Sequence, residues 1–548
     1  MMPGVSPTLK LKYGADATGA ASSPPPDLSI AATITAKQGA ARLEREQSIR
    51  HHSMENPYGD VPTASPGPKR SDPLPSWGES AGHLFHNALP SGLSMVMNQL
   101  IQFIALAYVG HIHGPAEVTA CSVGYFGLCL VALFPGAGMT FAVDTLCSQI
   151  FGMQPNSPKQ GVVVQRSLVV STVFLTCISS VLVFASETVL VSLYGRAAGE
   201  LAHRWLRWSP VYLTATVYSH SFRKFCCNQL KPYLVTVSLA VGALVTWAVS
   251  PTLVRTYGVA GASVASGVGM WAMLLALVVL IKRDPEANHR LGGLVPLNVL
   301  LAERPLRKYL KLGVPSAIFI TAESSAFDGS VLLAGLVGAV PAAAWSVIVQ
   351  TTVLFFSMTV GISTAACALV GRAIGRERPA EAKRYAFLAV MFAVLQSTIT
   401  STICVLWSHE VFGVTTTDPE VHRVIRQMIW IIPPFHILDC TQFSFQGISS
   451  AAGSNHLGAA VLLVSLCGIG LPLAYVLGIM NQYGILGVAG GLTIGMGIEV
   501  PLLIAMVLCT FHWKPAISTS ANASFANSPE SQASPQFVGD DADDLADV

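Results

Sequence analysis

Hydrophobic positions in this chain are grouped in runs of about twenty residues, the length that crosses the hydrocarbon core of a bilayer. Short polar stretches separate the runs, so the pattern predicts an all-α polytopic membrane protein with twelve transmembrane helices. The runs lie at residues 85–109, 116–141, 162–184, 204–225, 232–254, 258–281, 308–336, 343–366, 384–407, 424–447, 457–479 and 484–510. An even number of crossings predicts that both termini lie on the same side of the membrane.

Polar segments divide the chain into parts. Residues 1–82 are rich in Pro and Ser, and residues 513–548 end in an acidic stretch at 540–544. Neither composition supplies enough apolar surface to fold, so both are predicted to be disordered tails. Between them the pattern predicts an N-terminal six-helix lobe at 83–283, a connection at 284–306 and a C-terminal six-helix lobe at 307–512.

Charge is scarce and unevenly placed. Only 11% of the residues are charged while 52% are hydrophobic, and no basic stripe indicates a nucleic-acid partner. If the termini are cytoplasmic, the inner connections carry seventeen Lys and Arg and the outer ones six. Because cytoplasmic loops favour Lys and Arg, we expect cytoplasmic termini and a cytoplasmic connection between the lobes. The plasma membrane and an acidic organelle both remain open as locations.

The eleven cysteines lie mainly inside apolar runs, without the spacing of a CxxC or Cys/His metal site. They are interpreted as small buried hydrophobic residues. The sequence therefore predicts no metal and no cofactor.

The two halves of the chain resemble each other when one is shifted by about 225 residues. The motif around Pro90 returns around Pro315, and the Tyr-Gly…Gly-Met pattern at 257–270 returns at 483–496. A repeat of six helices keeps its orientation, which predicts two lobes related by a pseudo-twofold axis along the membrane normal, with a cavity between them. Pro90 and Pro315 are the candidate hinges, because a proline inside a helix removes a hydrogen bond.

Carboxyl groups within the spans are the main candidates for function. Glu323 and Asp328 lie in the seventh predicted helix and Asp439 in the tenth. Ionisable groups at membrane depth are costly and usually serve an ion, proton or substrate path. Five residues correspond to about 140° on a helix, so Glu323 and Asp328 should point to different sides, and we expect Glu323 to face the cavity. Pro433-Pro434 predicts a break near the middle of the tenth helix.

Other polar residues in the spans have weaker signals. Asn98, Gln99 and Gln350 are predicted to support the cavity, and Asn98 is the repeat equivalent of Glu323. The remaining polar groups each carry a simpler interpretation: Glu499 bonds to a neighbouring helix, His220 and His436 are packing residues with a proton shuttle as the alternative, and Asp144 is an N-cap for a short helix.

Four stretches together resemble the multidrug and toxin extrusion (MATE) transporters, in particular their eukaryotic branch. The most specific is Asp144-Thr145-Leu146-Cys147-x-Gln149. The other three are the first helix from Leu89-Pro90-Ser91 to Val109-Gly110-His111, Pro315-Ser316 followed by Glu323 and Asp328, and Gly361-Ile362-Ser363-Thr364 leading to Gly371-Arg372. The resemblance covers about residues 80 to 510.

The resemblance implies a proton-coupled exporter of organic cations whose essential carboxylates are Glu323, Asp328 and Asp439. The chain departs from the family where Ser324-Ser325 replace two tryptophans, which predicts fewer aromatic walls around a substrate. It also has Asp328 in place of Glu, and Gln446-Gly447 in place of an Arg-Gly pair.

These observations predict a monomeric secondary transporter that exchanges protons for small cationic substrates by alternating access. A sodium-coupled exporter or a lipid-linked flippase of the same architecture is one alternative. A membrane-embedded enzyme or a receptor is another, but no catalytic constellation supports it.

Overall fold

A computed structural model describes residues 73–416, 418–509, 511 and 513. The chain divides into two units, 1–66 and 67–548, and every described residue belongs to the second. The predicted tails therefore lie outside the described residues, except for residues 73–82 and Trp513.

The N-terminal half contains the six predicted crossings. The second crossing is built from several consecutive helices, and a short helix follows the third. The elements are α2 (Trp77–Ile112), α3 (Pro115–Leu128), η1 (Cys129–Leu133), α4 (Phe134–Met139), α5 (Phe141–Met153), α6 (Lys159–Phe184), α7 (Ser186–Tyr194), α8 (Arg196–Asn228), α9 (Pro232–Tyr257) and α10 (Val259–Arg283).

The C-terminal half also contains six crossings, after a connection with two short helices. The connection holds α11 (Pro285–Leu291) and α12 (Leu297–Leu300). The crossings that follow are formed by α13 (Glu303–Val337), α14 (Ala339–Gly375), α15 (Pro379–Leu406), α16 (Ser408–Gly413), α17 (Pro419–Met428), α18 (Ile432–Ala452), the continuous run of α19 (Asn455–Leu462), η2 (Leu463–Gly470), α20 (Leu471–Tyr475) and η3 (Val476–Met480), and α21 (Gly484–Cys509).

The first helix begins earlier than the apolar pattern predicts. Ser76 caps α2 through a capping box, in which the Glu79 N–H donates to the Ser76 hydroxyl at 3.2 Å and the Ser76 N–H donates to the Glu79 carboxylate at 2.7 Å. This reciprocal cap stabilises a polar first turn. Residues 77–82, assigned to the tail from composition, are therefore helical.

The predicted break in the tenth crossing is also misplaced. Pro433 and Pro434 lie in the first turn of α18, where a missing N–H breaks no hydrogen bond. The interruption instead falls at residues 429–431, between α17 and α18. Asp439 consequently lies on a regular helix.

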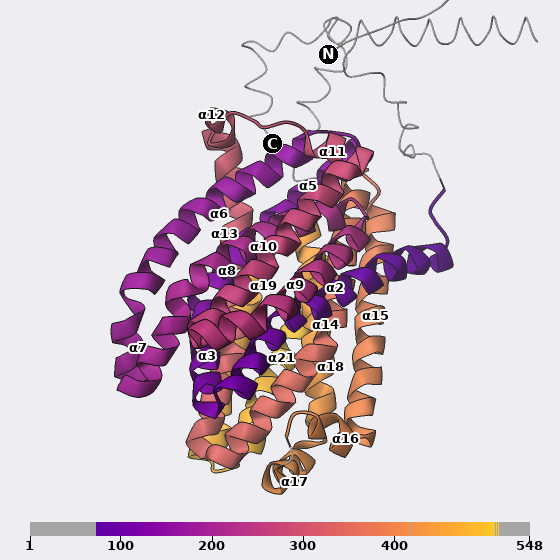
Figure 1. Cartoon of the computed structure of the whole chain (residues 1–548). Helices are drawn as coiled ribbons and strands as arrows, with labels where there is room; N and C mark the ends of the chain where they lie inside the picture. The colour runs from indigo at the N-terminus through magenta and orange to yellow at the C-terminus, as the bar shows by residue number, and fades with distance from the viewer. Residues whose placement is uncertain (1–72, 417, 510, 512, 514–548) are drawn as a thin grey trace, which may run out of the picture. The chain divides into compact units, whose positions relative to one another are not determined.

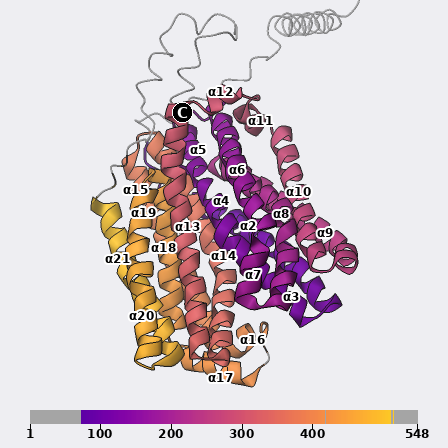
Figure 2. The same cartoon turned by 90° about the vertical axis from the view of Figure 1, so that its left-hand side faces the viewer.

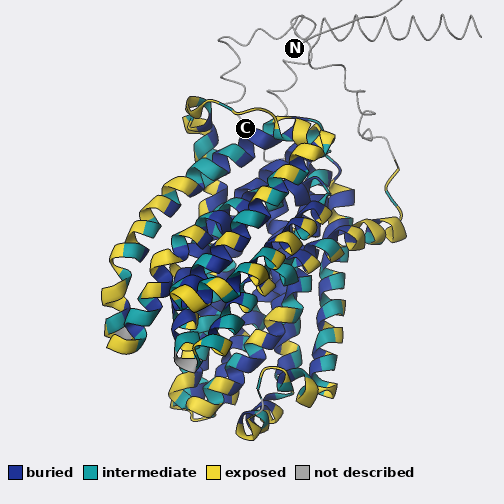
Figure 3. Cartoon of the chain, viewed as in Figure 1, coloured by how far each residue is buried: buried dark blue, intermediate teal, exposed yellow. Residues whose placement is uncertain are grey.

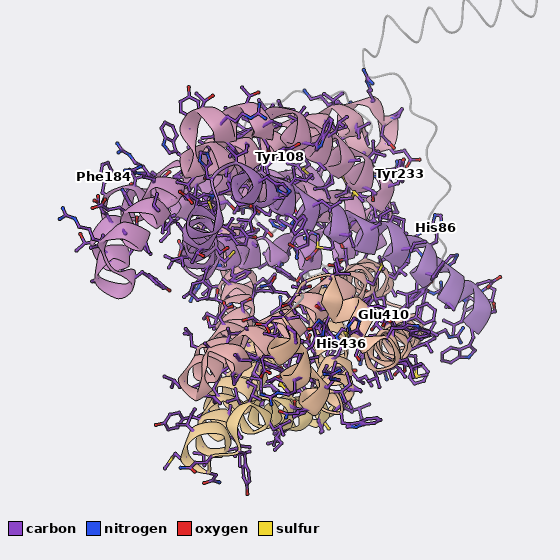
Figure 4. All side chains as sticks on the ribbon, turned by 60° about the horizontal axis from the view of Figure 1, so that its bottom comes forward. His86, Tyr108, Phe184, Tyr233, Glu410 and His436 are labelled. Carbon is purple, nitrogen blue, oxygen red and sulfur yellow. The ribbon has the colours of Figure 1, made fainter. Side chains whose placement is uncertain are left out.

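Ten helical segments among the described residues are long and apolar enough to cross a membrane by length and composition. The crossings formed by α8 and α18 are absent from that set because they carry more polar residues, many of them buried. Large apolar side chains are exposed on other helices, and Phe184 lies on the outside of the N-terminal half in Figure 4. Buried residues follow the inner helix faces (Figure 3), so the outer surface suits lipid.

The first helix of each half also packs against the other half. Leu84 and Ala88 of α2 belong to a hydrophobic cluster with residues of α14, α15 and α18, whereas Tyr309 and Leu312 of α13 belong to the core of the N-terminal half. In Figure 2, α13 lies between the indigo-to-magenta helices and the orange-to-yellow helices. The two repeat-related helices thus tie the lobes together.

Each of these helices runs through its proline. Pro90 lies inside α2 and Pro315 inside α13. The serine after each proline donates its hydroxyl to the carbonyl four residues earlier, Ser91 at 2.7 Å and Ser316 at 2.8 Å. Such back-bonding often accompanies helix bending. Both hinge candidates therefore share a local geometry that the sequence repeat predicts.

Candidate functional site

A cavity of about 500 Å³ lies between the two halves. Its polar groups come from both: Gln99 and Gln102 from α2, Asp328 from α13 and Gln350 from α14. Gln99 and Gln102 follow Pro90 along α2, and Asp328 follows Pro315 along α13. The structure therefore brings together three of the predicted site residues, Gln99, Asp328 and Gln350.

Aromatic side chains also line this cavity. Phe103, Tyr125, Phe126, Phe134 and Trp205 all line it, and the Tyr125 and Trp205 rings meet edge to face with centroids 6.1 Å apart. The prediction of fewer aromatic walls, drawn from the serines after Glu323, concerns α13 alone and stays a prediction. The aromatic residues come from the N-terminal half instead. A carboxyl group and aromatic rings that line the same cavity suit a cation.

A second polar site lies inside the C-terminal half. Glu323 and Asp439 are both buried, each 6% exposed. The side-chain amide of Gln442 joins them: its Nε2 donates to Glu323 Oε1, and to Asp439 Oδ1 at 3.4 Å. Among the described residues, neither carboxyl group forms an ion pair with Lys, Arg or His.

The two acids of α13 lie in different sites, as their angular separation on the helix predicts. Asp328 lines the inter-lobe cavity, but Glu323 is not among the lining residues. The expectation that Glu323 faces that cavity therefore fails in this conformation. Helix α13 supplies both sites, because residues five apart point to different sides.

Gln442 was missed by the sequence analysis. A glutamine in a polar stretch has no chemical signature of its own. Its position three residues after Asp439 was the available signal, because residues three apart share a helix face. Asn98, in contrast, is half-buried and is not among the residues that line the inter-lobe cavity.

The two candidate histidines bond to neighbouring side chains. His436 is fully buried within the C-terminal half (Figure 4), with Nε2 2.9 Å from the Thr400 hydroxyl. His220 Nδ1 lies 3.1 Å from Arg223 Nη2. Both contacts fit the interpretation of packing residues.

Asp144 does not cap a helix end. It lies inside α5, where its carboxylate pairs with the Lys224 ammonium and accepts a hydrogen bond from Asn228 Nδ2 at 3.0 Å. The Lys224 ammonium also lies 3.3 Å from the centroid of the Phe141 ring. The N-cap interpretation is wrong because the partners come from α8, a helix far away in sequence.

Helix α5 joins the two halves at the end of the molecule where α11 and α12 also lie (Figure 1). The Thr145 hydroxyl donates to the Ser450 carbonyl, and the Gln149 amide donates to the Ala451 carbonyl at 2.8 Å. Both acceptors lie in the last turn of α18, where carbonyls lack the usual helical partner four residues on; the Ser450 carbonyl also accepts from the Gly453 N–H at 3.2 Å. The motif from Asp144 to Gln149 therefore forms an inter-lobe contact, and none of its residues lines the inter-lobe cavity.

The chain matches the model of the MatE family twice, over residues 90–252 and 315–476. The two matches cover more than half of the chain and begin 225 residues apart, the shift that the internal repeat predicts. The chain belongs to the MatE family. Its helices accordingly form the two six-helix lobes of a MATE transporter fold.

Curated relatives match over most of their length. Multidrug and toxin extrusion protein 1 of Homo sapiens is 25% identical over 454 residues, which are 81% of this chain and 77% of that protein. Protein DETOXIFICATION 17 of Arabidopsis thaliana is 23% identical over 438 residues, 79% of this chain and 90% of that protein.

Solved structures share the fold. The crystal structure of the eukaryotic MATE transporter AtDTX14 superposes with a TM-score of 0.74 at 21% identity, covering 80% of this chain and 97% of that chain. A MOP superfamily transporter from Pyrococcus furiosus gives a TM-score of 0.68 at 18% identity, covering 78% of this chain and 94% of that chain.

Proposed function

We propose that this chain is a secondary active exporter of organic cations that exchanges substrate for protons by alternating access. The observation that carries the proposal is the buried pair of Glu323 and Asp439, which shares the Gln442 amide and has no basic partner among the described residues. A buried carboxyl group without a counter-charge must bind a proton or another cation. The names of the relatives, which refer to multidrug and toxin extrusion, support an export role.

The two polar sites divide the work in this proposal. The inter-lobe cavity binds the organic cation between the Asp328 carboxylate and the aromatic wall, and its volume of about 500 Å³ suits a small molecule. The Glu323 and Asp439 pair binds the protons. A proton and a cation that both neutralise the same lobe weaken each other's binding, and this antagonism is reciprocal.

Alternating access requires the inter-lobe contact at α5 to open while the cavity side closes. Pro90 and Pro315 are the bending points, because the halves of α2 and α13 on either side of them pack against different lobes. We propose that the protein lies in the plasma membrane or in the membrane of an acidic organelle, with both termini on the cytoplasmic side. One chain supplies both walls of the cavity, so a monomer is the working unit.

A transporter explains the polar groups better than a membrane-embedded enzyme does. Catalysis needs a nucleophile or an acid and base that converge on one point. His220 and His436 instead bond to Arg223 and Thr400. Sodium coupling shares the architecture and is separated from proton coupling by the experiment below.

The test uses the purified full chain in liposomes with radiolabelled tetraethylammonium, a permanent monocation that carries no proton. An imposed pH gradient should drive accumulation, and Glu323→Gln should abolish it. Glu410→Gln, which changes an exposed acid of the same lobe (Figure 4), is the matched control and should transport normally. Accumulation driven by a sodium gradient but not by a pH gradient would overturn proton coupling. Full activity of Glu323→Gln would overturn the assigned role.

A further inference from the structure

Glu499 is a third buried carboxyl group in the C-terminal lobe. It lies on α21 with no exposed surface, and neither carboxyl oxygen has a hydrogen-bond partner among the described residues. The Ser465 hydroxyl lies close to the Glu499 carboxyl group and donates to the Val461 carbonyl at 2.7 Å. The Ser465 hydroxyl on η2 is thus the neighbouring-helix group within reach of Glu499, as the sequence interpretation expects, and it brings no positive charge. A carboxylate in this setting has no compensation for its charge, so it must take up a proton or a cation.

Glu499 belongs to the same site as the other two acids. Helix α21 packs against α13 and α18, and Glu499 interacts electrostatically with Glu323 and with Asp439. Gln442 gives both of its recorded hydrogen bonds to Glu323 and Asp439, while its own amide oxygen is buried without a donor. The site therefore contains more unpartnered acceptors than donors, and protons would correct this imbalance.

The other titratable groups nearby do not supply the missing charge. The Cys467 thiol on η2 faces the Ala322 carbonyl at 3.7 Å, and His436 on α18 faces Thr400 of α15. No Lys or Arg in the described part of the chain pairs with Glu499. Nor do three His, Cys, Asp or Glu side chains there converge as metal ligands. Glu323, Asp439 and Glu499 therefore interact through their charges without meeting at one point.

We propose that Glu499 is a further proton-binding residue of the transporter, and that Glu323, Asp439 and Glu499 together exchange two protons for each substrate. This inference rests on the proposed function. The Gln442 amide donors stabilise one negative charge on the Glu323 and Asp439 pair, so one member of the pair is ionised. The other member and Glu499 each hold a proton when the site is closed to water. Both protons leave when the site opens to the less acidic side. Because the three groups titrate together, the number of protons describes the site rather than any single residue.

The number of coupled protons can be measured from the balance point of transport. Full-length protein in liposomes, with the membrane voltage clamped at zero, is given opposing gradients of pH and of tetraethylammonium until net flux stops. With two protons, a difference of one pH unit balances a substrate gradient of about 100-fold, and with one proton about tenfold. Wild type should give the first value and Glu499→Gln the second. Glu410→Gln, which changes an exposed acid of the same lobe, should match wild type.

The outcomes separate this inference from the proposed function. If a pH gradient does not drive transport by the wild-type protein, both the proposed function and the role of Glu499 are overturned. A pH-driven wild type with the same balance point as Glu499→Gln overturns only the role of Glu499. If Glu499→Gln binds tetraethylammonium but does not transport it, a pH-sensitive dye can count the protons that are released when tetraethylammonium binds to the protein in detergent. About one proton fewer than wild type supports the proposal, and an equal number refutes it. Loss of binding by a folded variant also refutes it, because Glu499 would then hold the binding site together.

Discussion

The buried ion pair between Asp144 and Lys224 is predicted to be one of the strongest single couplings in the N-terminal lobe. The Asp144 side chain is 8% exposed and the Lys224 side chain 5% exposed, so neither charge is solvated. The Asn228 amide donates to the carboxylate, and the Phe141 ring lies beneath the ammonium group. Replacing Lys224 by Met removes the positive charge but keeps most of the apolar stem.

The expected cost follows from the charge that is left behind. Breaking a buried pair on one side destabilises a protein by about 3–5 kcal/mol, because the remaining charge is buried without compensation. Lys224→Met leaves the Asp144 carboxylate with the Asn228 amide as hydrogen-bond donor and the Arg223 guanidinium as the nearby positive charge, so the lower end of this range is expected. The double variant Asp144→Asn/Lys224→Met removes both charges, and we expect it to recover most of the loss. The coupling energy should then be about 2–3 kcal/mol.

The assay is a double-mutant cycle on purified protein in detergent micelles, with unfolding by a denaturing detergent followed by tryptophan fluorescence. The exposed pair of Arg196 and Glu200, at the start of the same helix α8, provides the control. Its coupling should stay below about 0.5 kcal/mol, as exposed pairs usually do. An equally small coupling between Asp144 and Lys224 would show that the pair is solvated, and the reasoning from burial would fail.

Two further predictions concern the inter-lobe contact and the connection between the lobes. Gln149→Leu removes a hydrogen bond to the Ala451 carbonyl, worth about 1 kcal/mol, so the inter-lobe contact should open about fivefold more often. With the exposed cysteines replaced, maleimide should then label the buried Cys367 faster than in the parent protein. An unchanged labelling rate would contradict the prediction. The pKa of Asp284 is lowered: burial raises it, but hydrogen bonds from the Lys231 ammonium and the Ala287 N–H outweigh burial. Asp284 therefore stabilises the connection between the lobes above its unfolded pKa of about 4. This stabilisation is lost as the pH falls through the lower pKa of the folded state. Limited proteolysis of the connection at decreasing pH should therefore accelerate at a higher pH in Lys231→Met than in wild type, and equal profiles would show that Lys231 does not set the transition.

The sequence by itself determined the class of protein and the repeat. Apolar runs of membrane length locate all twelve crossings, because hydrocarbon leaves the backbone no partner outside the helix. The repeat shift of about 225 residues can be found without a structure, because it needs only the comparison of one stretch of sequence with another. The family matches at 90–252 and 315–476 reproduce it. The acids of the seventh and tenth helices were visible for the same reason, because a charged residue in an apolar run is conspicuous on its own.

Tertiary structure alone decided which of these residues meet. Whether Glu323 or Asp328 lines the cavity depends on the rotation of α13 against its neighbours, which side-chain packing sets. The aromatic side chains that line the cavity with Asp328 come from four other helices, so the local loss of two tryptophans did not predict them. That Glu499 is fully buried and lies near Glu323 and Asp439 also follows only from the packing of α21 against α13 and α18. Spacing along one helix can be read from sequence, but contacts between helices depend on angles and distances that distant parts of the chain determine together.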